Sequence, residues 1–396
     1  PPPPTTAHRP MESDYVWLLL GLPVAFVLGW AASRIDLRQL RAENRSVPKA
    51  YFKGLNFLLN EQQDQAIDAF IEAVQNDPDT SELHFALGNL FRRRGEYDRA
   101  VRVHEHLLQR GDLSPKDRDR AQHALALDFL KAGLLDRAEQ ALARLEGTDF
   151  EQPARLALLA IYERSRDWPQ AAAMAHKMHG SQGDFSARQA HYLCEQASER
   201  LAQQDAAAAL DLLAQAQAIA PQAARPRVEQ ARLHMQQGRC DAACATLRTL
   251  ASEAPMALPL AAALWAQAAR GCGKVDQARA LLEQHYAQAP SLDVLDAIVS
   301  LSQGTDAAPN TQAGRDWYLR HLQTEPSLVA AAKWLAGERL EHEEHHRAVQ
   351  RALDHATLPL TRYRCAACGF EARQHFWQCP GCQSWDSYPA RRIEEL

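Results

Sequence analysis

The chain has 396 residues and a net charge of only −5, with 44 Lys and Arg against 49 Asp and Glu. This length accommodates two or three domains or one long repeat array, and the near balance of charge gives no support to a general nucleic-acid-binding role. Aromatic residues make up only 7% of the chain. Its richness in Ala, Leu, Gln, Arg and Glu predicts helix throughout.

The first apolar feature in chain order is an uncharged run of 18 residues from Tyr15 to Ala32. As a helix it would extend about 27 Å, close to the thickness of a bilayer's hydrocarbon core. Glu12 and Asp14 precede it, whereas a signal peptide begins with basic residues. The arginines that follow it place the remainder of the chain in the cytoplasm by the positive-inside rule (Arg34, Arg38, Arg41 and Arg45). We predict a single-pass membrane helix, with a buried core helix as the alternative.

Small residues then recur with a period of 34 or 35 residues, which is typical of tetratricopeptide repeats. The pairs are Gly54 and Gly88, Asp64 and Asp98, Ala66 and Ala100, Ala209 and Ala243, and Ala243 and Ala278. A proline follows each of four alanines by twelve residues (Pro78, Pro221, Pro255 and Pro290). We expect the alanine where helix B crosses helix A closely, and the proline where helix B ends.

Turns between the two helices of a unit are predicted at glycines that favour a positive φ (Gly95, Gly133, Gly238 and Gly273). Gly54 and Gly88 are expected in helix A, where two backbones approach. Weaker units are predicted around Trp168 and Ala209, and a degenerate one near Gly314. In total we expect eight or nine units between Ala50 and about Thr357. Such arrays bind other proteins on a concave surface formed mainly by the A helices.

Two CxxC pairs near the C-terminus predict a metal site formed by Cys365, Cys368, Cys379 and Cys382. Each pair directs two thiolates from one tight turn, and two turns complete a tetrahedron. Four thiolates suit one iron or one zinc ion and leave no open position for hydrolysis. We favour a structural role for the ion over electron transfer, because no cofactor or electron-transfer partner motif accompanies it.

The segments around these cysteines contain glycine, proline and aromatic residues. Gly369 is expected to form the first turn, and Pro380 with Gly381 the second. Four aromatic residues are expected to supply an apolar shell for a module too small to build its own core (Tyr363, Phe370, Trp377 and Trp385). The metal would then provide much of the folding free energy of this module.

Three further motifs predict no chemistry. Residues 342–346 match the H-E-x-x-H pattern of zinc proteases, but their polar surroundings indicate a solvated segment, with His355 the one available third ligand. The 271–274 segment lacks the spacing of a P-loop. Cys240 and Cys244, one helical turn apart, are interpreted as small core residues, as free thiols suit a reducing compartment. We therefore predict no catalytic residue and no enzyme.

The order of these parts resembles the lipopolysaccharide assembly protein B family (LapB, also called YciM) of Gram-negative bacteria. The resemblance is carried by residues 54–59, 87–92, 99–100 and above all 363–385. It implies an inner-membrane regulator with its repeats in the cytoplasm. Members promote degradation of the deacetylase LpxC by the membrane protease FtsH, and gather enzymes of lipopolysaccharide synthesis at the membrane. The family's metal ligands correspond to Cys365, Cys368, Cys379 and Cys382.

The predicted architecture is an all-α tetratricopeptide solenoid with a transmembrane helix and a rubredoxin-like metal module. Its parts are a disordered tail (1–10), a membrane anchor (11–33), a linker (34–49), the array (50–357) and the metal module (358–396). We predict a non-enzymatic adaptor that contacts FtsH, LpxC and other proteins of lipopolysaccharide synthesis, and the membrane through residues 15–32. The alternatives are a rubredoxin-type electron-transfer protein and, more remotely, a zinc protease.

Overall fold

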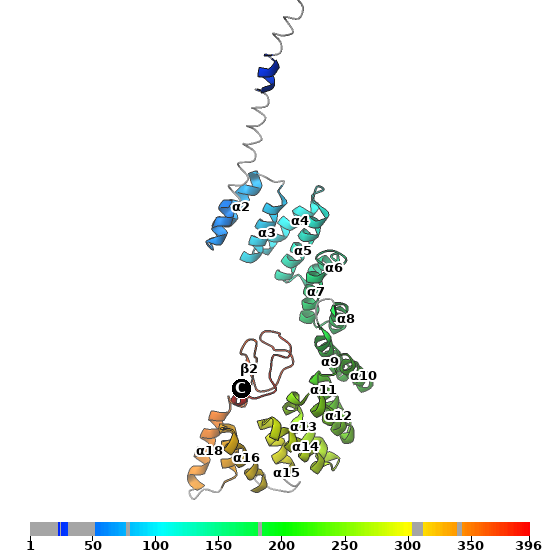
Figure 1. The fold of residues 1–396 in the computed structure, drawn as a ribbon, viewed down its shortest axis with the longest axis vertical. Coiled ribbons are helices and arrows are strands. Elements are labelled where there is room, and N and C mark those ends of the chain that lie inside the picture. Colours follow the sequence, from blue (N-terminus) through cyan, green and yellow to red (C-terminus); the bar gives the residue numbers. More distant parts are fainter. Residues whose placement is uncertain are drawn as a thin grey trace, which may run out of the picture. The chain divides into compact units, whose positions relative to one another are not determined.

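The computed structural model describes residues 23, 25–30, 52–76, 80–180, 184–302, 312–338 and 343–396. The chain divides into two compact units, Pro1–Ile161 and Tyr162–Leu396, and each is treated by itself below. In both units, helices follow one another as antiparallel hairpins (Figure 1). This confirms the predicted helical repeat array.

The first unit opens with a helical stretch over residues 52–59. It continues with α2 (Gln63–Asn76), α3 (Ser81–Arg94), α4 (Tyr97–Gln109), α5 (Pro115–Lys131), α6 (Leu135–Ala143) and most of α7 (Glu151–Ser165), which crosses the boundary between the units. The predicted alanines of helix B, Ala66 and Ala100, are fully buried in an apolar cluster with Phe70 and Phe91. Close packing at these positions is therefore as expected.

The second unit contains the remaining helices and the metal module. Its helices are α8 (Trp168–Met178), α9 (Ser186–Ala202), α10 (Ala206–Ile219), α11 (Ala224–Gln236), α12 (Cys240–Glu253), α13 (Pro259–Gly271), α14 (Val275–Gln288), α15 (Leu292–Ser302), α16 (Gln312–Thr324), α17 (Leu328–Ala336) and α18 (Glu343–Thr357), with a short 3₁₀ turn η1 (Pro255–Ala257). Its largest apolar cluster joins α11 to α15 and includes Ala243, Trp265 and Ala278.

The turns within the hairpins occur at the predicted glycines. Gly95 has a φ of 86° and ends α3, with its N–H donating to the carbonyl of Arg92. Gly133, Gly238 and Gly273 also have positive φ. Pro221, Pro255 and Pro290 each stand two residues beyond the last residue of a B helix, while Pro78 lies outside the described residues. The predicted helix ends are confirmed at these three prolines.

The glycines of helix A have a different role from the one expected. Gly54 and Gly88 face aromatic rings of helix B, Phe70 and His104, and not a neighbouring backbone. A Cβ atom on residue 88 would lie 2.5 Å from His104 Cε1 and Nε2. The His104 ring is fully buried. Its polarity is compensated by Asp128, which is also buried and accepts a hydrogen bond from the ring. Asp128 is in turn paired with Arg92 at 2.8 Å. Gly88 thus makes room for a buried polar network.

The predicted membrane helix lies largely outside the described residues, as do the tail and the linker. Of the run from Tyr15 to Ala32, only residues 23 and 25–30 are described, and they are helical. Among the residues that the structure describes, no helix has both the length and the apolarity needed to cross a membrane.

The metal module has little regular structure. It consists of the two-residue strands β1 (Tyr363–Arg364) and β2 (Glu371–Ala372), paired antiparallel, one bridge between Gln378 and Trp385, and the 3₁₀ turn η2 (Ile393–Glu395). Its own core is small: Tyr363, Tyr388, and the buried thiols of Cys365 and Cys379. The module therefore depends on something other than an apolar core for stability.

Gly88→Ala tests the space reserved for His104. The added methyl group overpacks a buried site at a cost of about 1–3 kcal/mol, more than the ~1 kcal/mol that Ala gains over Gly in a helix. We expect a lower free energy of unfolding and faster amide exchange in α3–α5. Gly111→Ala is the control, because a Cβ atom there meets nothing within 4 Å. Equal stability of the two variants, measured by urea denaturation, would contradict this packing account.

Candidate metal centre

The first cysteine turn follows directly from β1. The N–H of Cys365 donates to the carbonyl of Phe370 and the N–H of Gly369 donates to the carbonyl of Cys365, both at 2.9 Å. Gly369 has a φ of 78°, a conformation that a residue with a Cβ atom rarely adopts. The predicted role of Gly369 in the turn is confirmed, and Cys368 is held one residue before it.

The second cysteine turn contains Pro380 and Gly381, as predicted. The residue with positive φ is Gln383, at 61°, and not Gly381. The N–H of Gln383 donates to the carbonyl of Cys379 at 2.8 Å, and the N–H of Cys379 donates to the carbonyl of Ser384 at 2.9 Å. Gly381 instead lies against the Phe370 ring, where a Cβ atom would approach to 3.5 Å. The predicted turn at Pro380 and Gly381 is confirmed, although the positive φ falls on Gln383.

The two turns bring all four predicted ligands together. The four Sγ atoms lie within 4.8 Å of one another, with 3.8 Å between Cys365 and Cys382 and 3.7 Å between Cys368 and Cys379. Cys365 and Cys379 are buried, and Cys368 and Cys382 are exposed. Among the described residues, no other group of three or more His, Cys, Asp or Glu side chains converges in this way.

These spacings fit a tetrahedral metal ion. A metal–sulfur bond of about 2.3 Å gives tetrahedron edges of about 3.8 Å, which matches the two sulfur–sulfur distances above. Zinc and iron share this donor set and geometry. The four thiols can therefore hold one ion of either kind, and all four positions around it would be taken by protein.

The titration of the thiols also suits a cation. Burial opposes ionisation of Cys365, yet the Ser387 hydroxyl and neighbouring backbone N–H groups lower the pKa of its thiol to about 6. The hydroxyl and N–H of Ser384 lower the pKa of Cys382. At Cys368 an N–H bond from Phe370 favours the thiolate, but burial and the other thiols raise the pKa to about 12. A bound metal ion would replace the protons of these thiols.

The aromatic residues predicted as a shell for the module have two distinct roles. Tyr363 belongs to the core of the module, whereas Phe370 is exposed. Trp377 and Trp385 contact the array: Trp377 packs against the cluster of α11–α15, and Trp385 stacks on His191 with ring centroids 4.7 Å apart. Trp377 also packs edge-on against His375 of the module, with ring centroids 4.8 Å apart, so the predicted shell includes it. The prediction was wrong for the exposed Phe370, and it did not show that Trp385 faces the array.

The first set of contacts fixes the module to α7 and α9. The indole N–H of Trp385 donates to Glu163 at 3.0 Å, and the hydroxyl of Tyr192 donates to the same carboxylate. Nε2 of His191 lies 2.8 Å from Asp386. His191 and Tyr192 are 3% and 0% exposed, so this contact has the character of a core and not of a loose surface contact.

The second set joins the module to α15. Arg392 forms a bidentate salt bridge with Asp293, in which Nε donates at 2.9 Å and Nη2 at 2.8 Å. Its guanidinium also lies over the Tyr363 ring, whose hydroxyl donates to Asp293 at 3.2 Å. Burial disfavours the charge of Arg392, but the bonds to Asp293 outweigh it and raise the pKa of the guanidinium. Bidentate pairs of this kind are strong and specific in orientation.

The third set consists of two glutamates at the end of the chain. Glu394 accepts hydrogen bonds from the N–H groups of Leu328 at 2.6 Å and Val329 at 3.1 Å, and from the Ser327 hydroxyl at 2.7 Å. Glu395 accepts from the N–H of Leu292 at 2.6 Å. Both carboxylates therefore satisfy free N–H groups at helix N-termini, of α17 and α15, where negative charge is also favoured by the helix dipole.

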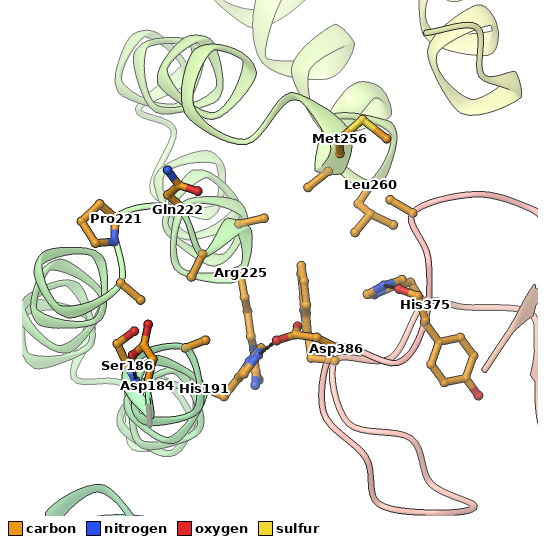
Figure 2. A pocket seen from close by; sticks show the side chains of 18 residues that line it. Asp184, Ser186, His191, Pro221, Gln222, Arg225, Met256, Leu260, His375 and Asp386 are labelled. Carbon is orange, nitrogen blue, oxygen red and sulfur yellow. Dashed lines mark hydrogen bonds and ion pairs between the residues drawn. The ribbon is translucent and has the colours of Figure 1, made fainter. Parts of the chain in front are cut away.

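A cavity of about 560 Å³ opens between the helices and the module. Figure 2 shows Arg225 reaching from α11 towards His191 and Asp386, with Met256 and Leu260 on another side and His375 facing them from the module. Burial lowers the pKa of His375. A second cavity, of about 400 Å³, continues along the C-terminal segment of the module. Met256, 67% exposed, lines both cavities.

Comparison with known proteins shows the family to which the chain belongs. Residues 363–388 match the family model of a rubredoxin metal binding domain, and residues 83–119 match that of a tetratricopeptide repeat. Lipopolysaccharide assembly protein B of Escherichia coli K12 is 31% identical over 389 residues, covering 96% of this chain and 99% of the relative. The chain belongs to the lipopolysaccharide assembly protein B family.

A second member of this family, from Haemophilus influenzae, is 27% identical over 395 residues, covering 93% of this chain and 96% of the relative. Among solved structures, a tetratricopeptide repeat protein from Parabacteroides merdae has a TM-score of 0.33 at 13% identity, over 65% of this chain and 100% of that one.

The other motifs of the sequence form no such centre among the described residues. Of the H-E-x-x-H segment, His342 lies outside the described residues, whereas Nε2 of His346 is hydrogen-bonded to the carbonyl of Leu335 at 3.2 Å and His355 is exposed. The 271–274 segment forms the turn between α13 and α14, with Gly273 at a φ of 70°.

Cys365→Ser combined with Cys368→Ser tests the four-thiol assignment. We expect the variant to lose its metal ion and the fold of residues 358–396, because two thiolates cannot replace the missing folding free energy. Elemental analysis measures the metal, and the far-UV circular dichroism of the array should stay largely helical. Cys240→Ser is the control. Full retention of metal by the double variant would contradict the assignment.

Proposed function

We propose that this protein is a non-catalytic adaptor in lipopolysaccharide assembly. The observation that carries the proposal is the docking of a four-thiol module on a helical array, so that residues of both line one cavity. A closed coordination sphere supplies no open position for substrate. The names of the relatives support the assembly role, and helical repeat arrays support protein binding.

The cavity suits a segment of polypeptide better than a small polar metabolite. Much of its lining is alanine, with proline, methionine, leucine and tryptophan (Ala187, Ala220, Pro221, Ala223, Ala224, Met256, Ala257, Leu260, Trp377 and Ala390). Two of its polar groups are paired within the protein: Nε2 of His191 with Asp386, and Nη2 of Arg225 with Glu195 at 2.7 Å. Nε and Nη1 of Arg225 are buried without a hydrogen-bond partner among the described residues, so they can donate to a backbone carbonyl of a bound segment. Apolar side chains of a partner would gain burial here without displacing these pairs.

We further propose, from the family resemblance, that the partner is LpxC and that the adaptor presents it to FtsH. A membrane anchor at residues 15–32 would confine both proteins to one surface and raise their effective concentration. The sequence around this segment supports the anchor: an uncharged run followed by four arginines. The bulk of the chain then lies on the cytoplasmic side of the inner membrane.

A rubredoxin-type electron-transfer role is less well supported. Much of the module's aromatic and charged surface is used in contacts with the array, through Trp385, Arg392 and Glu394. These contacts are what a structural module needs, and relatives are named for assembly and not for redox chemistry.

Met256→Glu tests whether the cavity is the binding site for LpxC. The new carboxylate places a charge in the apolar part of the cavity, so we expect LpxC to bind at least tenfold more weakly, the equivalent of about 1.4 kcal/mol. Met256 is 67% exposed, so the fold should be unaffected. Leu156→Glu is the matched control, at a leucine that is 46% exposed and is not among the residues that line the cavity. Unchanged binding of LpxC by Met256→Glu in a titration would exclude this cavity.

Deletion of residues 1–33 tests the tether. We expect a folded protein that still binds LpxC but no longer lowers its level in cells, because the effective concentration at the protease is lost. The half-life of LpxC after translation is stopped is the measurement. The full-length protein with Cys240→Ser serves as a control for expression. If LpxC is degraded at the normal rate, the tethering proposal is wrong.

A further inference from the structure

A pair of cysteines outside the metal module lies in direct contact. Sγ of Cys244, on α12, is 3.4 Å from Sγ of Cys272, which directly follows α13. The two residues are 28 positions apart and belong to consecutive hairpins, α11–α12 and α13–α14. Neither thiol belongs to the four-thiol metal centre.

The two thiols differ in access. Cys244 is 8% exposed and belongs to the apolar cluster of α11–α15, whereas Cys272 is partly exposed at the turn before α14. A cavity of about 50 Å³ is lined by Cys244, Trp265 and Lys274. This volume accommodates a molecule the size of one or two waters. Cys272 does not line this cavity; an oxidant reaches Cys272 because its side chain is partly exposed at the turn, while Cys244 lies buried in contact with it.

Their surroundings also differ in charge and proton affinity. Burial is the main reason why the pKa of the Cys244 thiol is raised to about 12. The hydrogen bond to Cys272 and the negative charge of a Cys272 thiolate raise it further, while the positive charge of Lys274 lowers it. Lys274 is itself paired with Asp241 at 2.6 Å. Cys244 therefore keeps its proton, whereas Cys272 is the thiol of the pair that lies partly exposed. Reactivity with oxidants follows the thiolate.

A third thiol in this region is set apart by packing. A Cβ atom added at Gly271 would lie only 2.6 Å from Sγ of Cys240, so the absence of a side chain at Gly271 makes room for this thiol. Cys240 is one helical turn before Cys244 but is seated against the end of α13. It provides an internal comparison for the pair, as does the buried and isolated Cys194.

We infer that Cys244 and Cys272 are a site of reversible disulfide formation that links two consecutive repeat units when the protein meets a hydroperoxide. The inference does not depend on the proposed adaptor function, since it rests on the sulfur–sulfur contact and the difference in access alone.

The chemistry balances in two steps. The Cys272 thiolate attacks the terminal oxygen of the hydroperoxide, the O–O bond breaks, and the alcohol leaves after taking up a proton, so that Cys272 becomes a sulfenic acid. The Cys244 sulfur then attacks the Cys272 sulfur, the S–O bond breaks, and hydroxide leaves as water with the proton of Cys244. Two thiols lose two electrons and two protons, and one hydroperoxide is reduced to an alcohol and water.

Formation of this disulfide would restrict the movement of neighbouring repeat units. A disulfide would tie α12 to the turn between α13 and α14, and so fix the angle between two neighbouring repeat units. Rotation between units sets the curvature of a repeat array. The α13 helix also supplies Leu260 to the cavity described above.

The test uses the full-length, metal-loaded protein in detergent, treated with increasing tert-butyl hydroperoxide. Free thiols are then alkylated, and the protein is digested without reduction for mass spectrometry. We expect one new linked peptide pair, Cys244 with Cys272, with more than half of it formed before Cys194 or the metal-site cysteines change, and with full reversal by dithiothreitol. Amide exchange in the turn between α13 and α14 should slow in the oxidised protein.

Three variants separate the roles. Cys244→Ser should leave Cys272 as a sulfenic acid that dimedone traps, Cys272→Ser should abolish oxidation at Cys244, and Cys240→Ser should form the disulfide as the wild type does. A link from Cys272 to Cys240, oxidation of Cys194 at the same oxidant concentration, or no oxidation of Cys272 before the metal centre is lost would each overturn the inference.

Discussion

The four-thiol cluster is the constraint on which the described architecture of the second unit depends. Residues 358–396 bury only a few apolar side chains of their own, too few for a chain of that length to fold alone. Sulfur–sulfur distances of 3.7 and 3.8 Å show a set of ligands already shaped for one tetrahedral ion. We therefore expect metal binding and folding of the module to be coupled.

The folded module in turn completes the helical array. Glu394 and Glu395 satisfy N–H groups at the starts of α17 and α15, and Arg392 pairs with Asp293 of α15. On its other side Trp385 covers His191 and binds Glu163. A small metal site thus stabilises helices distant from it in the chain, and it forms one wall of the cavity where we place the partner. In an adaptor, such coupling would make binding of the partner depend on the metal ion.

Local patterns predicted what depends on local geometry. The Ala-to-Pro spacing marked the buried faces and ends of B helices, Gly95 marked a turn, and the CxxC pairs marked the ligands. Contacts between distant residues were beyond such patterns. Trp385 and Glu163 are 222 residues apart, and no local period links them. The ring of His104 behind Gly88 and the contact of Cys244 with Cys272 likewise depend on tertiary packing.

Hydrogen exchange of the intact protein before and after removal of the metal by a chelator tests the central claim most directly, because the amides of Leu292, Leu328 and Val329 donate to the module's carboxylates. The account predicts that chelation speeds exchange at the first turns of α15 and α17 and throughout residues 358–396, while α3–α5 stay unchanged. If those two helix starts keep their protection after the metal is gone, the module does not complete the array and the account is wrong.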